Sequence, residues 1–200
     1  RMASTNFGDA AEDIKPIIPS GTSDSGALDA VFEVLVRSGR NAPLAKTMLV
    51  PEAWSKATTD MKPAWADMYA YCNSVIEPWD GPAALAMTDG RWVCGGLDRN
   101  GLRPLRYVVT GDGLLIAGSE AGMVATDESG VVEKGALGPG QMIAVDMTDG
   151  RLWHDAELKD RLAAARRRLG GPGVVVSDIE ARLGTRYTID LIRALRRQAP

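Results

Sequence analysis

Three Asp-Gly dipeptides that separate β-type runs, at residues 89–90, 112–113 and 149–150, constrain the fold more than any other feature of this sequence. Asp-Gly favours the two-residue turns with positive φ that join adjacent antiparallel strands. Short runs with an apolar period of two flank each dipeptide. These runs are 83–87, 91–95, 105–109, 114–117, 142–146 and 151–154. The second half of the chain is therefore predicted to form antiparallel hairpins, arranged as two packed sheets or as one large sheet.

Helical periodicity flanks this strand-rich region on both sides. Apolar residues recur three and four positions apart over 26–38 and over 62–76, and the same spacing returns over 155–169. Ser38-Gly39 and Pro78 are typical terminators after the first two segments. The sequence therefore predicts an α+β fold, with helices before and after the antiparallel strands.

The two ends of the chain give weaker signals. A short strand is predicted at 14–18, a further strand at 174–176 and a short basic helix at 189–195. The last 40 residues carry nine arginines and three acidic residues, whereas the first 160 hold 14 basic and 23 acidic residues. Only Tyr187 is aromatic in this basic tail, so the stacking groups of a nucleic-acid arm are lacking and no nucleic-acid partner is expected.

Composition indicates a folded chain that needs no disulfide framework. Of the 200 residues, 45% are hydrophobic and 24% charged, which suits one domain with its own core. The two cysteines, Cys72 and Cys94, favour a reducing compartment, so a cytoplasmic location is expected. No apolar run approaches the roughly 18 residues of a membrane helix, and no membrane partner is expected. The opening Arg1-Met2 shows no export signal and is interpreted as an internal start.

Residue types with ready-made catalytic chemistry are sparse. The single histidine, His154, follows Trp153 at a predicted strand end without a local serine or cysteine, so it is interpreted as a surface or strand-end residue and not as a general base. One histidine and two distant cysteines do not make a metal site. The segment 138–140 (GPG) is interpreted as a tight turn, because its proline interrupts the free amides that a phosphate cradle needs.

Three segments combine charged residues with glycine or proline: 77–82, 98–104 and 118–120. The middle one, DRNGLRP, is predicted to be a rigid loop between two strands, because Asn-Gly favours a tight turn and proline stiffens the exit. An ion pair of Asp98 with Arg99 and Arg103 is expected to stabilise this loop. Asp80, Arg99 and Arg103 are accordingly assigned structural roles.

Five segments, taken in order, resemble the amidotransferase domain of the large subunit of bacterial glutamate synthase: SDSGALD at 23–29, MLVPE at 48–52, EPWDGPA at 77–83, DRNGLRP at 98–104 and GSE at 118–120. The resemblance extends over about residues 9–165. It implies a class II glutamine amidotransferase of the N-terminal-nucleophile (Ntn) hydrolase type, with an α-β-β-α sandwich of two antiparallel sheets between helical layers. That sandwich is expected to be incomplete in this chain.

The resemblance also implies a reaction and its partners. Glutamine is hydrolysed to glutamate and ammonia, and the ammonia is added to 2-oxoglutarate by other domains of the synthase. FMN, an iron–sulfur cluster and NADPH are expected to bind elsewhere in that enzyme, in further domains and the small subunit, and none in this chain. Two alternatives stay open: another class II amidotransferase, of the purine or asparagine synthesis type, and a non-catalytic structural or regulatory module.

The chain departs from the family pattern at the nucleophile. In the family this is an amino-terminal cysteine whose own amine acts as base. Residue 1 here is arginine, and neither Cys72 nor Cys94 could expose such an amine. The family's carboxylate-binding arginine and its oxyanion-hole Asn-Gly pair also belong to sequence that would precede Arg1. No catalytic residue is assigned, and this chain alone is expected to be inactive.

One substrate-binding residue carries over from the family. Asp24, in Ser-Asp-Ser, matches the aspartate that binds the α-amino group of glutamine, and a carboxylate at a helix start can pair with an ammonium. The alternative interpretation makes Asp24 a helix N-cap, a role compatible with the first.

Two regions are distinguished along the chain. Residues 1–165 are assigned to the later part of a class II glutamine amidotransferase domain, and residues 166–200 to a divergent tail rich in arginine and glycine. An altered reading frame near Ala165 or a lineage-specific terminus would each produce such a tail.

Overall fold

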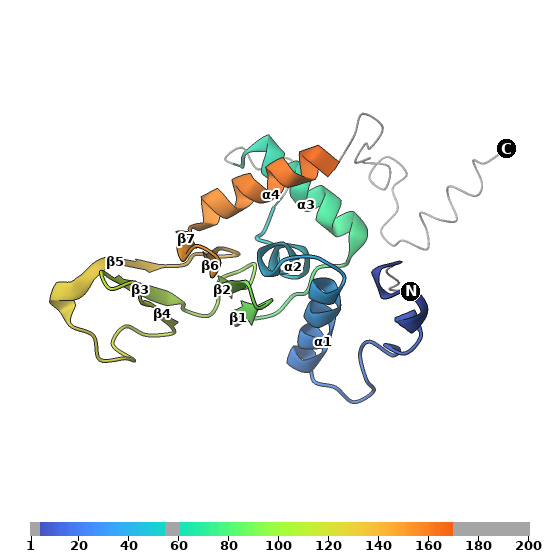
Figure 1. Cartoon of the computed structure of the whole chain (residues 1–200), viewed down its shortest axis with the longest axis horizontal. Helices are drawn as coiled ribbons and strands as arrows, with labels where there is room; N and C mark the ends of the chain where they lie inside the picture. Colours follow the sequence, from blue (N-terminus) through green and yellow to red (C-terminus); the bar gives the residue numbers. More distant parts are fainter. Residues whose placement is uncertain (1–4, 55–60, 170–200) are drawn as a thin grey trace.

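The computed structural model describes residues 5–54 and 61–169, and over these ranges the fold is α+β (Figure 1). The helices there are η1 (Thr5–Ala11), α1 (Asp24–Arg37), α2 (Ala42–Leu49), α3 (Pro63–Val75), η2 (Glu128–Gly130) and α4 (Asp155–Leu169). The strands are β1 (Ala84–Thr88), β2 (Trp92–Leu97), β3 (Arg106–Thr110), β4 (Leu115–Gly118), β5 (Val131–Ala136), β6 (Met142–Asp146) and β7 (Arg151–Trp153). The predicted strand at 174–176 and helix at 189–195 lie outside the described residues.

The Asp-Gly dipeptides at 89–90, 112–113 and 149–150 each lie between antiparallel neighbours, which confirms the predicted hairpins. They separate β1 from β2, β3 from β4 and β6 from β7. Gly90, Gly113 and Gly150 each have positive φ, a conformation that glycine adopts at little cost. The strands form two sheets rather than one, a four-stranded sheet of order β1-β2-β6-β7 and a three-stranded sheet of order β4-β3-β5.

The hydrophobic core lies between the four-stranded sheet and the helices. From the sheet it takes Trp92 and Cys94 of β2 and Met142 and Ala144 of β6, all at most 2% exposed. Met68, Tyr69 and Cys72 come from α3, and Leu158, Leu162 and Ala163 from α4. The helix predicted at 62–76 is thus confirmed, with Cys72 on its buried face and Val75 at its end 45% exposed. Each large apolar side chain buried in this way contributes about 1.5–3 kcal/mol relative to exposure.

Helix α2 lies at the centre of the molecule, beside α1, α3 and β2 (Figure 1). Seven of its eight residues are buried, including Lys46 and Thr47. Asn41 caps it by accepting a hydrogen bond from the Leu44 amide at 3.0 Å, and Pro43 occupies its first turn, where no amide is needed. The helix therefore forms from good local capping and is held by packing on every side.

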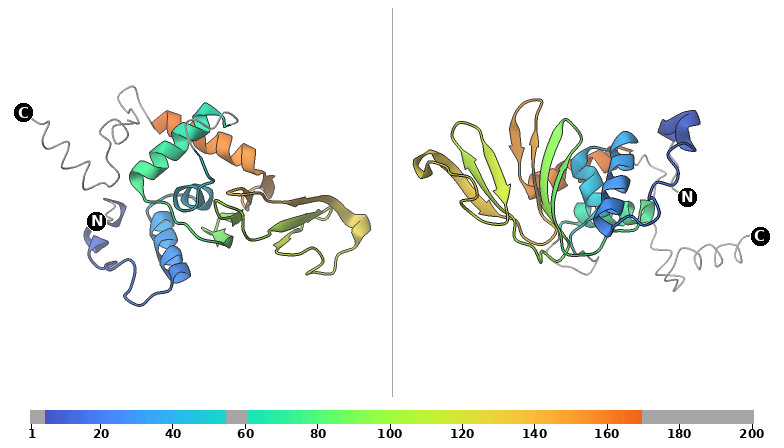
Figure 2. Two further views of the ribbon diagram at one scale, coloured as in Figure 1. Left: turned by 180° about the vertical axis from the view of Figure 1, so that it is seen from behind. Right: turned by 90° about the horizontal axis from the view of Figure 1, so that it is seen from below.

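The three-stranded sheet lies on the opposite side of the four-stranded sheet from α1 and α2, as Figure 2 shows in its right-hand view. Its strand β5 has no counterpart among the predicted strands. The sequence of β5, VVEKGA, contains Glu133, Lys134 and Gly135, residue types that are depleted in strands. Pairing with β3 along most of its length holds β5 in place despite this local preference.

The strand predicted at 14–18 is wrong. Residues 16–18 form a bend, and the described chain enters α1 without any strand before it. Pro16 has no amide hydrogen to donate to a neighbouring strand, and Pro19 directly follows the segment, so a regular ladder is disfavoured here.

Candidate functional site

Asp24, the residue predicted to bind substrate, occupies the first turn of α1. The N-cap is Ser23, whose Oγ accepts a hydrogen bond from the Gly26 amide at 3.2 Å, so the alternative interpretation of Asp24 as the cap is wrong. Asp24 is exposed, and its carboxylate lies at the helix end where the dipole favours negative charge. The geometry thus leaves this carboxylate accessible to a cationic group.

A cavity of about 230 Å³ lies between α1, α2 and β1. It begins at Leu28, which is four positions after Asp24 and therefore on the same face of α1, one turn further along. Most of its wall is apolar, with the carboxylates of Asp29 and Glu33 contributed by α1. The lining residues are Leu28, Asp29, Phe32, Glu33, Lys46, Leu49, Val50, Leu85, Ala86, Met87 and Thr88.

A buried ionic cluster lies behind this cavity, and we define it as Lys46, Glu52, Tyr69, Asp155 and Lys159. Lys159 Nζ contacts Glu52 Oε2 at 2.8 Å and Asp155 Oδ2 at 2.6 Å, although its side chain is only 2% exposed. Tyr69 donates its hydroxyl hydrogen to Glu52 Oε1 at 3.1 Å. Burial, and then the charge of Glu52, raise the pKa of the Tyr69 hydroxyl well above its usual range. Lys159 therefore pairs directly with both carboxylates, and the cluster as a whole contains two lysines and two carboxylates, equal numbers of opposite charges.

Lys46 links this cluster to the loop before β6. It is 1% exposed, and its Nζ donates a hydrogen bond to the Gly140 carbonyl at 2.6 Å. Burial lowers the pKa of Lys46 to about 8, because removing the ammonium from water disfavours its charged form. Gly140 in turn donates its amide hydrogen to the Asp98 carbonyl at 2.7 Å. The helix layer is thus connected through hydrogen bonds to the loop at 98–104.

Asp98 organises that loop through backbone amides and not through the predicted arginines. Its Oδ1 accepts from the Ala83 amide at 3.1 Å, and its Oδ2 accepts from the Asn100 amide at 3.0 Å. Arg99 instead faces Asp80 at 4.0 Å, across two partly exposed side chains. The expected ion pair of Asp98 with arginine is therefore wrong, because a fully buried carboxylate meets nearby amides more readily than an exposed guanidinium.

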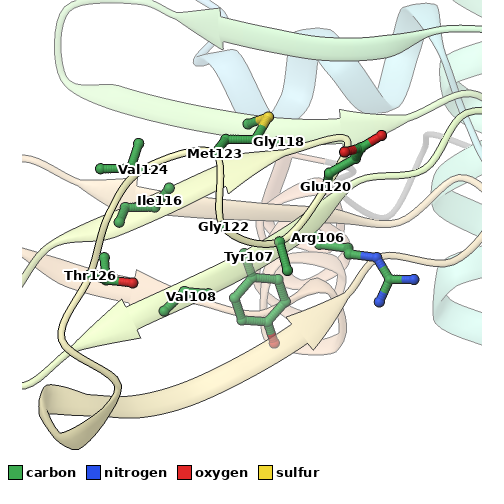
Figure 3. Close-up of a pocket in the computed structure, with 11 residues that line it drawn as sticks. Arg106, Tyr107, Val108, Ile116, Gly118, Glu120, Gly122, Met123, Val124 and Thr126 are labelled. Atoms are coloured by element: carbon green, nitrogen blue, oxygen red, sulfur yellow. The ribbon is translucent and has the colours of Figure 1, made fainter.

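The segment at 118–120 does not open a ligand site. Residues 119–126 fold over β3 and β4, and the Met123 side chain lies so close to Gly118 that a Cβ there would overlap it (Figure 3). The pocket under this segment has a volume of about 20 Å³, with Arg106 and Glu120 at one end and Val124 and Thr126 at the other (Figure 3). Such a volume holds about one water molecule.

Neither cysteine is accessible to a substrate. Cys72 is 0% exposed and Cys94 is 1% exposed. Burial raises the pKa of the Cys94 thiol to about 12, so its nucleophilic thiolate form is disfavoured near neutral pH. This agrees with assigning neither thiol the role of nucleophile.

His154 lies at the junction of β7 and α4, which confirms its interpretation as a strand-end residue. Its Nε2 contacts Glu133 Oε1 at 2.7 Å, a partner 21 positions away that no local pattern indicates. No group of three or more histidine, cysteine, aspartate or glutamate side chains within 5–54 and 61–169 could hold a metal ion. In the same part of the chain, no helix has the length and apolar character needed to span a membrane.

Comparison with known proteins identifies the family. The model of the class-II glutamine amidotransferases matches residues 1–168. The glutamate synthase [NADPH] large chain of Azospirillum brasilense is 61% identical over 168 residues, which cover 83% of this chain and 11% of the relative. The corresponding large chain of Bacillus subtilis is 41% identical over 163 residues, covering 82% of this chain and 11% of the relative.

A third relative is the ferredoxin-dependent glutamate synthase 2 of Synechocystis sp., which is 46% identical over 154 residues. The match covers 76% of this chain and 10% of that protein. The chain thus spans about a tenth of the length of the curated relatives it matches. The order of helices and antiparallel sheets described above agrees with the Ntn-hydrolase-like fold of this family.

Proposed function

The chain belongs to the class-II glutamine amidotransferases, and we propose that it forms part of the glutamine-hydrolysing domain of a glutamate synthase. Three relatives at 41–61% identity carry that name, two of them as large chains. The observation that carries the proposal is the accessible carboxylate of Asp24 in the first turn of α1, one helical turn before Leu28, which lines the cavity between α1, α2 and β1.

In this proposal Asp24 binds the α-ammonium group of glutamine. A carboxylate and an ammonium form a charge-assisted hydrogen bond, which is stronger than a neutral one. Ser23 fixes the backbone on one side of Asp24 through its cap to Gly26, so the carboxylate is presented from a rigid helix end. The fixed position reduces the conformational entropy lost when the ligand binds.

The remaining steps of the proposed reaction belong to other parts of a longer enzyme. There, ammonia released from glutamine is added to 2-oxoglutarate, with FMN, an iron–sulfur cluster and NADPH supplying the reducing equivalents. Cys72 and Cys94 are both buried, and one comes from α3 while the other comes from β2, so they do not suit cluster ligation. We therefore assign cofactor binding to further domains and to a small subunit.

Asp24→Asn tests the proposed contact. We expect this variant of the 200-residue chain to bind L-glutamine about tenfold or more weakly, because the amide cannot neutralise an ammonium. Titration calorimetry with L-glutamine measures the effect, and glutaramate, which lacks the α-amino group, should bind equally to both forms.

Two control variants separate ligand binding from helix stability and from general charge. Ser23→Ala removes the helix cap, at about 1 kcal/mol, but keeps the carboxylate. Asp67→Asn removes an exposed carboxylate from α3. Asp67→Asn should retain the affinity for glutamine, and Ser23→Ala should weaken binding much less than Asp24→Asn, because the carboxylate that pairs with the ammonium remains. If Ser23→Ala weakened binding as much as Asp24→Asn, the assigned role of Asp24 would be lost.

We also expect the 200-residue chain to release no ammonia from glutamine. Both thiols are enclosed in the core, so neither can attack the carboxamide. An ammonia assay should give the same background rate for the chain and for a Cys72→Ser, Cys94→Ser double variant. Turnover by the chain above that of the double variant would refute the expectation.

A further inference from the structure

The two sheets are joined to each other by side chains and loops and not by strand pairing. Among the described strands, every ladder lies within one sheet or the other. The side-chain bridge runs from His154, which follows β7, to Glu133 of β5, with Nε2 and Oε1 2.7 Å apart. The bridge thus crosses directly from one sheet to the other.

Glu133 is held from the side of the three-stranded sheet as well. Tyr107 of β3 donates its hydroxyl hydrogen to the same Oε1 at 2.8 Å. The tyrosine ring has room because residue 135 is glycine, where a Cβ would overlap the ring. The ring also meets the His154 imidazole edge-on, with centroids 6.3 Å apart. Glu133 is therefore a shared acceptor between a residue of its own sheet and the histidine of the other.

The groups that face His154 favour its protonated form. Glu133 approaches from β5 and Glu157 from α4, where Glu157 Oε2 lies 3.6 Å from His154 Nδ1. Glu157 also accepts the His154 amide at 3.0 Å and is paired with Arg151 of β7 at 3.0 Å. The phenol of Tyr107 completes this environment. Two carboxylates against one guanidinium leave a net negative surrounding for the imidazole.

We propose that His154 is a pH-dependent latch between the two sheets. In its protonated form the imidazolium holds Glu133 by a charge-assisted hydrogen bond and fixes the three-stranded sheet against the four-stranded one. In its neutral form only an uncharged donor remains, so the three-stranded sheet gains freedom to pivot on the loops at 98–105 and 137–141.

The direction of the pH dependence follows from the two partners. The hydrogen bond to Glu133 raises the pKa of His154 above its ordinary value, and the hydrogen bond from His154 lowers the pKa of Glu133. The stabilising contribution of His154 is fully present below about pH 6.5 and is lost as the pH rises through the raised pKa. At low pH the stabilising contribution of the His154–Glu133 pair persists until the pH falls through the lowered pKa of Glu133.

A titration of the histidine ring tests the electrostatic half of the proposal. The chain has a single histidine, so one ring Cε1–H resonance in proton–carbon NMR spectra reports on it without assignment. We expect its midpoint to lie above that of a histidine in a short peptide, and the upward shift to diminish in Glu133→Gln. A midpoint at the peptide value, or one unchanged by Glu133→Gln, would overturn the latch.

A distance measurement tests the conformational half. Val132→Cys on β5 and Met147→Cys after β6 place spin labels at positions 68% and 60% exposed, whereas the two native cysteines are buried. Double electron–electron resonance spectroscopy measures the distance between the two labels. It should give a narrow distance distribution at about pH 6 and a broader one at about pH 9.

Three variants in this doubly labelled chain separate the latch from general effects of pH. Glu133→Gln should give the broad distribution at both pH values. Glu157→Gln, which leaves the bridge between the sheets intact, should stay narrow at the lower pH. His154→Gln keeps a hydrogen-bond donor but has no group that titrates, so its distance distribution should be the same at both pH values. One distribution shared by all variants at both pH values would overturn the proposal.

Discussion

Gly140→Ala is expected to lower the free energy of unfolding by about 3 kcal/mol or more in total. Of this loss, roughly 1–2 kcal/mol is the cost of a left-handed backbone for an alanine. Gly140 has a φ of 68°, in the left-handed region. A Cβ at this position would overlap the Cα and Cβ atoms of Glu52, so the segment that carries Glu52 into the buried ionic cluster would have to move. Urea denaturation, followed by the fluorescence of the five tryptophans, measures the loss.

Gly150→Ala is the matched control for this prediction. Gly150 has the same φ of 68° in the hairpin between β6 and β7, but a Cβ there would meet no atom within 4 Å. The control should cost only about 1–2 kcal/mol, the price of the backbone conformation alone. Equal losses for the two variants would show that the contact with Glu52 relaxes freely and that Gly140 has no packing role.

Lys159→Met is expected to cost about 3 kcal/mol, because it leaves two largely buried carboxylates, 17% and 15% exposed, without their shared cation. Lys159 contacts both Glu52 and Asp155 from a side chain that is 2% exposed. Methionine fills a similar volume, so the loss reports on charge and hydrogen bonding more than on packing. Denaturation in urea, with circular dichroism of the helices as the signal, measures it.

Lys62→Met provides the comparison at the surface. Lys62 pairs with Asp160 at 2.9 Å, but its side chain is 56% exposed, so the change should cost at most about 1 kcal/mol. Combining Lys159→Met with Glu52→Gln should cost less than the two single changes together, since the second removes the charge that the first left unpaired. Strict additivity would show that Lys159 and Glu52 do not interact energetically.

Local chemistry explains which elements are predictable from the sequence. The hairpins are encoded by Asp-Gly, whose turn geometry needs no distant partner. The helices α1, α3 and α4 each have one face in the core, so their apolar spacing is visible. Strand β5 is specified mainly by its pairing with β3, whereas helix α2 is specified by its Asn41 cap together with the elements packed around it.

The residues of the candidate site likewise differ in whether a local sequence pattern indicates them. Asp24 is identified through the short Ser-Asp-Ser motif, and its position at a helix start follows from local capping. The buried ionic cluster has no such local signature, because Lys159 meets Glu52 across 107 positions and Lys46 meets the Gly140 carbonyl across 94. A lysine within the apolar run at 42–50 is the one sequence signal that could have indicated a buried charge. Its partners become evident only in three dimensions.

The balanced charges of the buried ionic cluster have a consequence for how such a chain can diverge. A neutralising replacement at Lys46, Glu52, Asp155 or Lys159 leaves an unpaired charge inside the protein. A second replacement that removes a charge of the opposite sign restores neutrality. These four positions are therefore expected to evolve as a coupled group: a lineage that loses one of the charges should soon lose or replace its counterpart.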